Sequence, residues 1–125
     1  MYHNGLQAYQ SVNKITVTGR ETEANVLNQS ALRLKRCLDT WDGSLNHEKE
    51  LDEALRTNQK IWTLFQLELM QEDHPLPKKL RVDLLRLSAF IDKRTYDLLA
   101  FPDKAKLPIL IDINNNIAAG LRETP

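Results

Sequence analysis

The chain has 125 residues, with 17 Lys and Arg against 17 Asp and Glu, so its formal net charge is zero. This length predicts one domain with its own hydrophobic core. A content of 42% hydrophobic residues with few glycines and prolines excludes the disordered, collagen-like and low-complexity classes. Zero net charge argues against a dedicated nucleic-acid-binding protein, which needs an excess of Lys and Arg to neutralise phosphates.

Cysteine usage and the N-terminal residues indicate the compartment. The single cysteine, Cys37, cannot form an internal disulfide, which fits a reducing environment. Residues 1–5 lack the basic region and the apolar run of a signal peptide, and the apolar runs along the chain are too short to cross a bilayer. We therefore expect a cytoplasmic protein that does not insert into a membrane.

The first helix is predicted from a capping pattern. Thr18 and Glu21 have the S/T-x-x-E spacing in which each side chain can accept a backbone N–H at a helix start. This predicts a helix from residue 18 to the turn at residues 42–44, preceded by an N-terminal arm, residues 1–17, with at most a short helix at 6–12. The expected buried stripe, at three- and four-residue spacing, is Ala24, Leu27, Ala31, Leu34, Leu38 and Trp41.

Ser44 has the residue type that caps a helix, so it is predicted to begin the second one. Proline lacks an N–H and restricts the residue before it, so Pro75 and Pro77 are predicted to stop this helix. Its inward side is expected to carry Leu51, Leu55, Asn58, Ile61, Trp62, Phe65 and Leu69.

The third helix is predicted to open just after Pro77, and the fourth to have Pro108 in its first turn. Expected buried residues of the third are Leu80, Leu84, Leu87, Ile91 and Leu98, and of the fourth Leu107, Leu110, Ile111, Ile117, Ala118 and Leu121. Because strand signals are almost absent, we predict an all-α fold, a small antiparallel bundle of about four main helices over residues 18–125.

The sequence holds no recognisable catalytic motif. His3, His47 and His74 each lack a second ligand three or four residues away on a helical face. Cys37 falls beside the core stripe with no histidine close in sequence, so it is interpreted as a structural residue. We expect no enzymatic activity, no cofactor and no metal.

The third helix is apolar on two sides, because a second set of apolar residues lies opposite its core stripe. This pattern is typical either of a central helix covered by its neighbours or of a partner-binding surface. We also expect the N-terminal arm to lie over or beside this second side and to compete there with a partner helix. The candidate partner-binding residues are Val82, Leu85, Ala89, Phe90, Tyr96, Tyr9 and Val12.

Two asparagines fall on inward-facing stripes. Asn58 and Asn114 are expected to form hydrogen bonds inside the bundle, because an unpaired buried amide is costly. The alternative is that they line a groove and bond to a partner's backbone. Trp62, on the same stripe as Asn58, is expected to be a core residue rather than a partner contact.

Three segments carry a family likeness: NQKIWTL at residues 58–64, LPKKLR at 76–81 followed by Leu84 and Leu87, and LIDINNNIAAGL at 110–121. Their order and spacing resemble the FlaF family of bacterial flagellar biosynthesis regulators, with looser support at residues 8–10 and 20–23. Two departures are Phe90-Ile91, where the family often has a Trp-Val pair, and residues 101–106, where many members have a Gly-containing turn.

The resemblance implies a non-enzymatic, cytoplasmic helical protein that binds unassembled flagellin as a secretion chaperone or adaptor. It also implies promotion of flagellin synthesis and export, in opposition to FlbT, which restrains translation of flagellin mRNA. The absence of a recognisable catalytic motif is compatible with this role, because covering the apolar helical surface of an unassembled subunit requires no catalytic group.

Two other functions stay open. The protein could regulate translation by binding flagellin mRNA itself, through Lys78, Lys79 and Arg81, with a steep salt dependence. Zero net charge counts against this function. Alternatively, it could be an adaptor whose main partner is FlbT.

Overall fold

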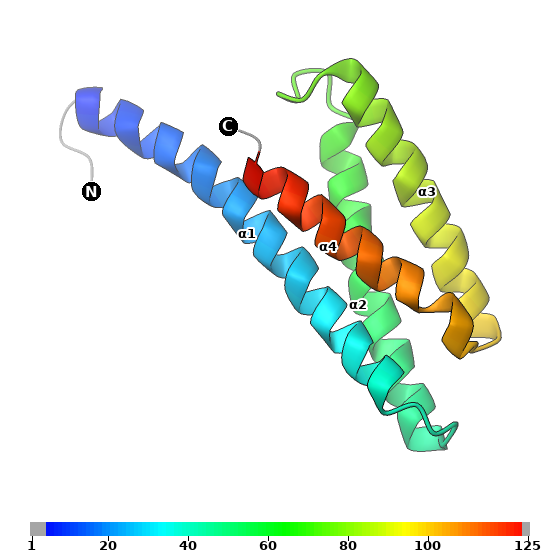
Figure 1. Ribbon diagram of the computed structural model, residues 1–125. Coiled ribbons are helices and arrows are strands. Elements are labelled where there is room, and N and C mark those ends of the chain that lie inside the picture. The colour runs from blue at the N-terminus through cyan, green and yellow to red at the C-terminus, as the bar shows by residue number, and fades with distance from the viewer. Residues whose placement is uncertain (1–4, 124–125) are drawn as a thin grey trace.

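The computed structural model describes the backbone of residues 5–123 and the side chains of residues 19–123. Over this range the elements are α1 (Gly5–Asp39), α2 (Leu45–Leu69), α3 (Lys78–Ala100), the short 3₁₀ helix η1 (Lys104–Lys106) and α4 (Pro108–Glu123), with no strand. Successive α-helices run in opposite directions (Figure 1). The predicted all-α fold with four main helices is therefore confirmed.

The long helix α1 contacts two other helices of the bundle, α4 and α2. Helix α4 packs along it, and α2 packs against it after the turn that follows Asp39. Helix α3 has α2 as its main neighbour and lies on the opposite side of the molecule from α1 (Figure 1). One long side of α3 is consequently remote from the other described helices.

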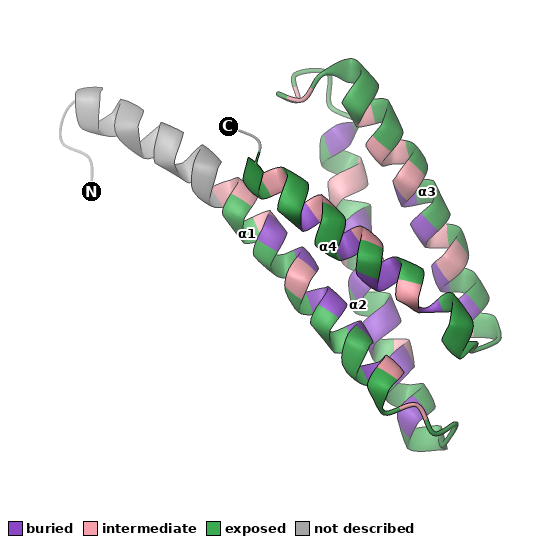
Figure 2. Ribbon diagram, viewed as in Figure 1, coloured by how far each residue is buried: buried purple, intermediate pink, exposed green. Residues whose placement is uncertain are grey.

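The core lies between the inward stripes of the helices (Figure 2). Ala24, Leu27, Ala31 and Leu34 of α1 are buried, as predicted, while Leu38 and Trp41 are partly buried against the same cluster. The predicted inward residues of α2 and α4 are likewise buried or partly buried. Helical spacing was thus sufficient to identify most of the core.

Inside this core the two predicted asparagines are fully buried and joined. Asn58 of α2 and Asn114 of α4 are hydrogen-bonded to each other, and Ser30 of α1 and Trp62 of α2 bond to the pair. The expectation of internal hydrogen bonding is confirmed, and the alternative of groove-lining amides is wrong. Trp62, 1% exposed, is a core residue as expected.

The predicted start of the first helix is wrong. Helix α1 begins at Gly5 and continues without a break through Thr18 and Glu21. The S/T-x-x-E pattern spans only four residues, and the same residue types can also lie in the middle of a helix with their side chains at its surface. Because residues 5–17 continue the axis of α1, they do not turn back over α3 (Figure 1). The side chains of Tyr9 and Val12 lie outside the described residues.

One other helix boundary and the burial of one residue differ from expectation. Helix α2 ends at Leu69, before the prolines, where the N–H of Met70 donates to the carbonyl of Gln66. Leu80, predicted to be buried, is 42% exposed. It lies in the first turn of α3, and spacing predicts which side a residue faces but not whether a neighbour extends far enough along the axis to cover it.

The turn between α1 and α2 is fixed by short polar contacts. Asp42 Oδ1 accepts from the Ser44 N–H at 2.9 Å, and Ser44 Oγ accepts from the His47 N–H at 3.1 Å. Between them, Gly43 has a φ of +71°, a conformation that favours glycine. The predicted cap at Ser44 is therefore confirmed.

Candidate functional site

The second side of α3 is an open surface. We call Val82, Leu85, Ala89, Phe90 and Tyr96 the outer face of α3. Tyr96 is 63% exposed, Phe90 and Val82 are each more than a third exposed, and Leu85 is half-buried. The interpretation of α3 as a central, covered helix is therefore wrong for the part of the chain that the structure describes.

One basic side chain lies against this face. The guanidinium of Arg94 lies 5.1 Å from the centre of the Phe90 ring, within the range of a cation–π contact. The same guanidinium donates to the carbonyl of Lys106 at 3.1 Å. Arg94 therefore links Phe90, in one of the two sequence departures noted above, to residues 101–106 between α3 and α4, which are the other departure.

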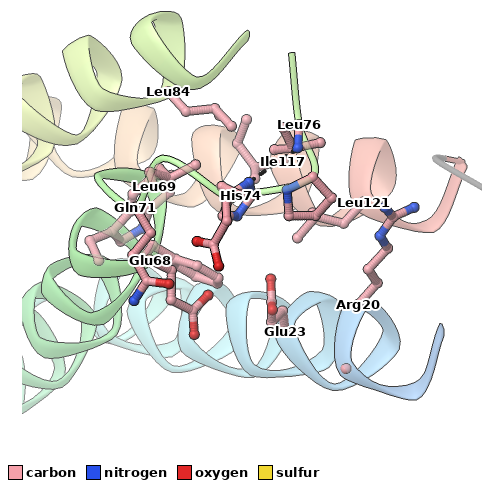
Figure 3. Close-up of a pocket in the computed structure, with 15 residues that line it drawn as sticks. Arg20, Glu23, Glu68, Leu69, Gln71, His74, Leu76, Leu84, Ile117 and Leu121 are labelled. Carbon is pink, nitrogen blue, oxygen red and sulfur yellow. Dashed lines mark hydrogen bonds between the residues drawn. The ribbon is translucent and has the colours of Figure 1, made fainter. Parts of the chain in front are cut away.

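A pocket of about 560 Å³ lies at the other end of α3, where the ends of several helices meet (Figure 3). We call it the end pocket. It lies between α1 near Gly19, the C-terminal half of α2, the connection from Gln71 to Leu76, and the C-terminal half of α4. Its apolar lining consists of Trp62, Phe65, Leu69, Pro75, Leu76, Leu84, Ile117 and Leu121.

The charged groups of the end pocket are mostly acidic. Glu23, Glu68 and Asp73 line it, against one arginine, Arg20, and His74. In Figure 3, Glu23 extends from α1 into the pocket. Partial burial raises the pKa of Glu23, the negative charge of Glu68 raises this pKa further, and Arg20 lowers it.

The connection that forms one wall of the pocket is held by hydrogen bonds. Arg81 Nη1 donates to the carbonyl of Gln71 at 2.7 Å, which joins the start of α3 to the end of α2. His74 Nδ1 accepts from the Leu76 N–H at 3.2 Å, so this ring is oriented by its own segment. These hydrogen bonds therefore hold the connection in one conformation, although it contains no helix.

Sequence reasoning did not predict the end pocket. Its lining comes from residues 19–23, 62–76, 84 and 117–121, and helical periodicity carries no information about which distant segments meet at one end of a bundle. The outer face of α3 was predictable because all its residues lie on one helix.

The described side chains offer no metal centre, since they contain no group of three or more His, Cys, Asp and Glu that could hold an ion. Cys37 is buried, and burial is the main cause that raises the pKa of its thiol, so the reactive thiolate is disfavoured. His47 Nε2 lies 2.7 Å from the carbonyl oxygen of Cys37, which ties this ring to the end of α1.

Two groups of basic residues, one at Arg33, Lys35 and Arg36 on α1 and one at Lys78, Lys79 and Arg81, are partly engaged in contacts within the protein. Arg33 bonds to Thr57 and lies 3.5 Å from Glu53, and Lys35 pairs with Asp39 at 2.7 Å. Arg81, the third member of the Lys78-Lys79-Arg81 group, is bound to Gln71 as described above. This arrangement leaves a smaller basic surface than the sequence suggests.

A family model described as flagellar protein FlaF matches residues 5–121, nearly the whole chain. The chain belongs to the FlaF family. This match confirms the resemblance and identifies a flagellar protein of a family that is regulatory rather than known for catalysis. Neither the search of curated proteins nor the search of solved structures found a match. No helix among the described residues is both long and apolar enough to span a bilayer.

Proposed function

We propose that this FlaF protein is a non-enzymatic, cytoplasmic chaperone or adaptor that binds unassembled flagellin. In this role it promotes flagellin synthesis and export, in opposition to FlbT. The observation that carries the proposal is the uncovered outer face of α3, with Val82, Phe90 and Tyr96 exposed on one helix. Membership of a flagellar protein family supports flagellin as the partner that this face binds.

The physical basis is helix-on-helix recognition. An unassembled subunit exposes apolar helical surface that it later buries in the filament, and an exposed apolar face of a chaperone can cover that surface in the meantime. The area of such a face does not by itself set the affinity, so the complex can be reversible. Flagellin has to be released at the export apparatus, so its binding to the chaperone must be reversible.

The test is direct binding of purified, unpolymerised flagellin to the full chain, beside FlbT alone and flagellin leader RNA alone. We expect a complex with flagellin, and we expect Tyr96→Ser to raise its Kd about fivefold or more, because large aromatic contacts dominate interfaces. Leu45→Ser is the matched control, since Leu45 is 85% exposed and lies at the start of α2.

Each other outcome has a defined meaning. Retention of RNA with a steep salt dependence and no flagellin would replace this function with direct mRNA binding. Retention of FlbT alone would make the protein an FlbT adaptor. Equal effects of Tyr96→Ser and Leu45→Ser on flagellin binding would remove the outer face from the binding surface.

A further inference from the structure

The end pocket combines an apolar lining with an excess of negative charge. The function proposed above, which depends on the outer face of α3, does not involve this pocket. Phe65, Leu69 and Leu84 come from two helices that meet at this end, and Ile117 and Leu121 close it from α4. Such an apolar centre with charged groups around it is the usual anatomy of a protein-binding site.

The carboxylates give the pocket its selectivity. Glu23 is about half-buried, and its unfavourable interaction with Glu68 is only partly offset by Arg20. Asp73 adds a third carboxylate to the lining. A cation placed between these groups would relieve the repulsion between Glu23 and Glu68, whereas an anion would increase it.

We propose that the end pocket receives an amphipathic helical segment of the client, which inserts apolar side chains and presents an adjacent Lys or Arg to Glu23 and Glu68. The proposal rests on the proposed chaperone function. It makes the end pocket a second binding site for the client, in addition to the outer face of α3. Charge complementarity selects the occupant: apolar groups match Phe65, Leu69 and Leu121, and the basic group matches the two carboxylates.

The first experiment compares two charge reversals on α2. Glu68→Lys changes the pocket, and Glu50→Lys makes the same change at an exposed position toward the other end of the helix. With purified unpolymerised flagellin, we expect Glu68→Lys to raise the Kd about tenfold and to reduce its salt dependence, while Glu50→Lys changes the Kd less than about twofold. Equal Kd values for the two variants would overturn the proposal.

The second experiment separates the pocket from the identity of the client. The probe is a synthetic helical peptide with leucines on one face and lysines beside them, paired with a counterpart that has glutamates in place of the lysines. We expect the full-length wild-type protein to prefer the lysine peptide by about tenfold and Glu68→Lys to lose that preference.

The two experiments also keep the two proposals apart. If flagellin does not bind the wild-type protein but the lysine peptide binds and Glu68→Lys weakens it, the chaperone function fails and the pocket assignment stands. If flagellin binds the wild-type protein and Glu68→Lys and Glu50→Lys bind it equally, the chaperone function stands and the pocket assignment fails. A wild-type protein that binds both peptides equally also overturns the pocket assignment.

Discussion

Asn114 Nδ2 donates a hydrogen bond of 2.7 Å to Asn58 Oδ1, and both side chains are completely buried. The same Asn114 amide donates to the carbonyl of Leu27 at 3.2 Å and accepts from Trp62 Nε1 at 2.9 Å. One side chain of α4 therefore bonds to α1 and to two residues of α2. Because these bonds have directions and lengths that sliding would break, they fix the axial register of three helices.

Removing the central amide should destabilise the fold strongly. Asn114→Ala leaves the Trp62 N–H without its acceptor in the core and creates a cavity, so we expect a loss of about 3 kcal/mol in the free energy of unfolding. Chemical denaturation measures this change. Asn116→Ala, at an exposed position of the same helix, should change stability by about 0.5 kcal/mol or less. Similar losses in the two variants would contradict the role assigned to Asn114.

Trp62 contributes both to this network and to the lining of the end pocket. Its ring is 1% exposed and packs edge-on against Phe65, with centroids 5.7 Å apart. We expect Trp62→Ala to cost about 3 to 5 kcal/mol, a large share of the stability of a small domain. Thermal unfolding and flagellin binding should be measured together, because an unchanged melting temperature with lost flagellin binding would make Trp62 a partner contact instead.

The features that could be predicted from the sequence are those that depend on residues close together in the chain. The stripes through Leu27, Leu55 and Leu110 were predictable because three- and four-residue spacing places apolar residues on one side of a helix. The cap at Ser44 was predictable because it depends on residues three positions apart. Each of these features can be identified within one or two turns of chain.

The errors arise where the outcome depends on distant segments. Thr18 and Glu21 suggested a helix start, but capping patterns do not exclude a helix that continues in both directions. Leu80 has the spacing of a buried residue, yet it is 42% exposed in the first turn of α3, because burial also depends on the neighbouring segments. The end pocket is the extreme case, since Glu23 and Leu121 are brought together only by the packing of α1 with α4.

The Ser44 cap supports a specific stability prediction. Ser44→Ala removes the acceptor for the His47 N–H at the start of α2 and should cost about 1 kcal/mol. Thr63→Ala is the matched control, because the Thr63 hydroxyl bonds to the Gln59 carbonyl within the same helix and is exposed. We expect the control to be neutral in chemical denaturation. A loss as large in Thr63→Ala would show that the cap is not the cause.

The charge arrangement of the end pocket predicts a pH-dependent stability. The pKa of Glu23 is raised in the folded protein, first by burial and then by Glu68, so the folded state favours the protonated carboxyl. The stability from this group is present below the unfolded pKa and is lost as the pH rises through the folded pKa. At about pH 7, ionised Glu23 therefore destabilises the fold relative to a neutral side chain.

Glu23→Gln should consequently raise the melting temperature at about pH 7, and the gain should disappear at about pH 3, where the wild-type carboxyl is protonated in both states. The gain should shrink in a Glu68→Gln background, since part of the shift comes from that charge. Glu21→Gln serves as the control, because exposed Glu21 lies 3.5 Å from Arg122 and its loss offers no comparable gain. A gain from Glu23→Gln that is independent of both pH and Glu68 would show that the carboxyl is not under electrostatic strain in the pocket.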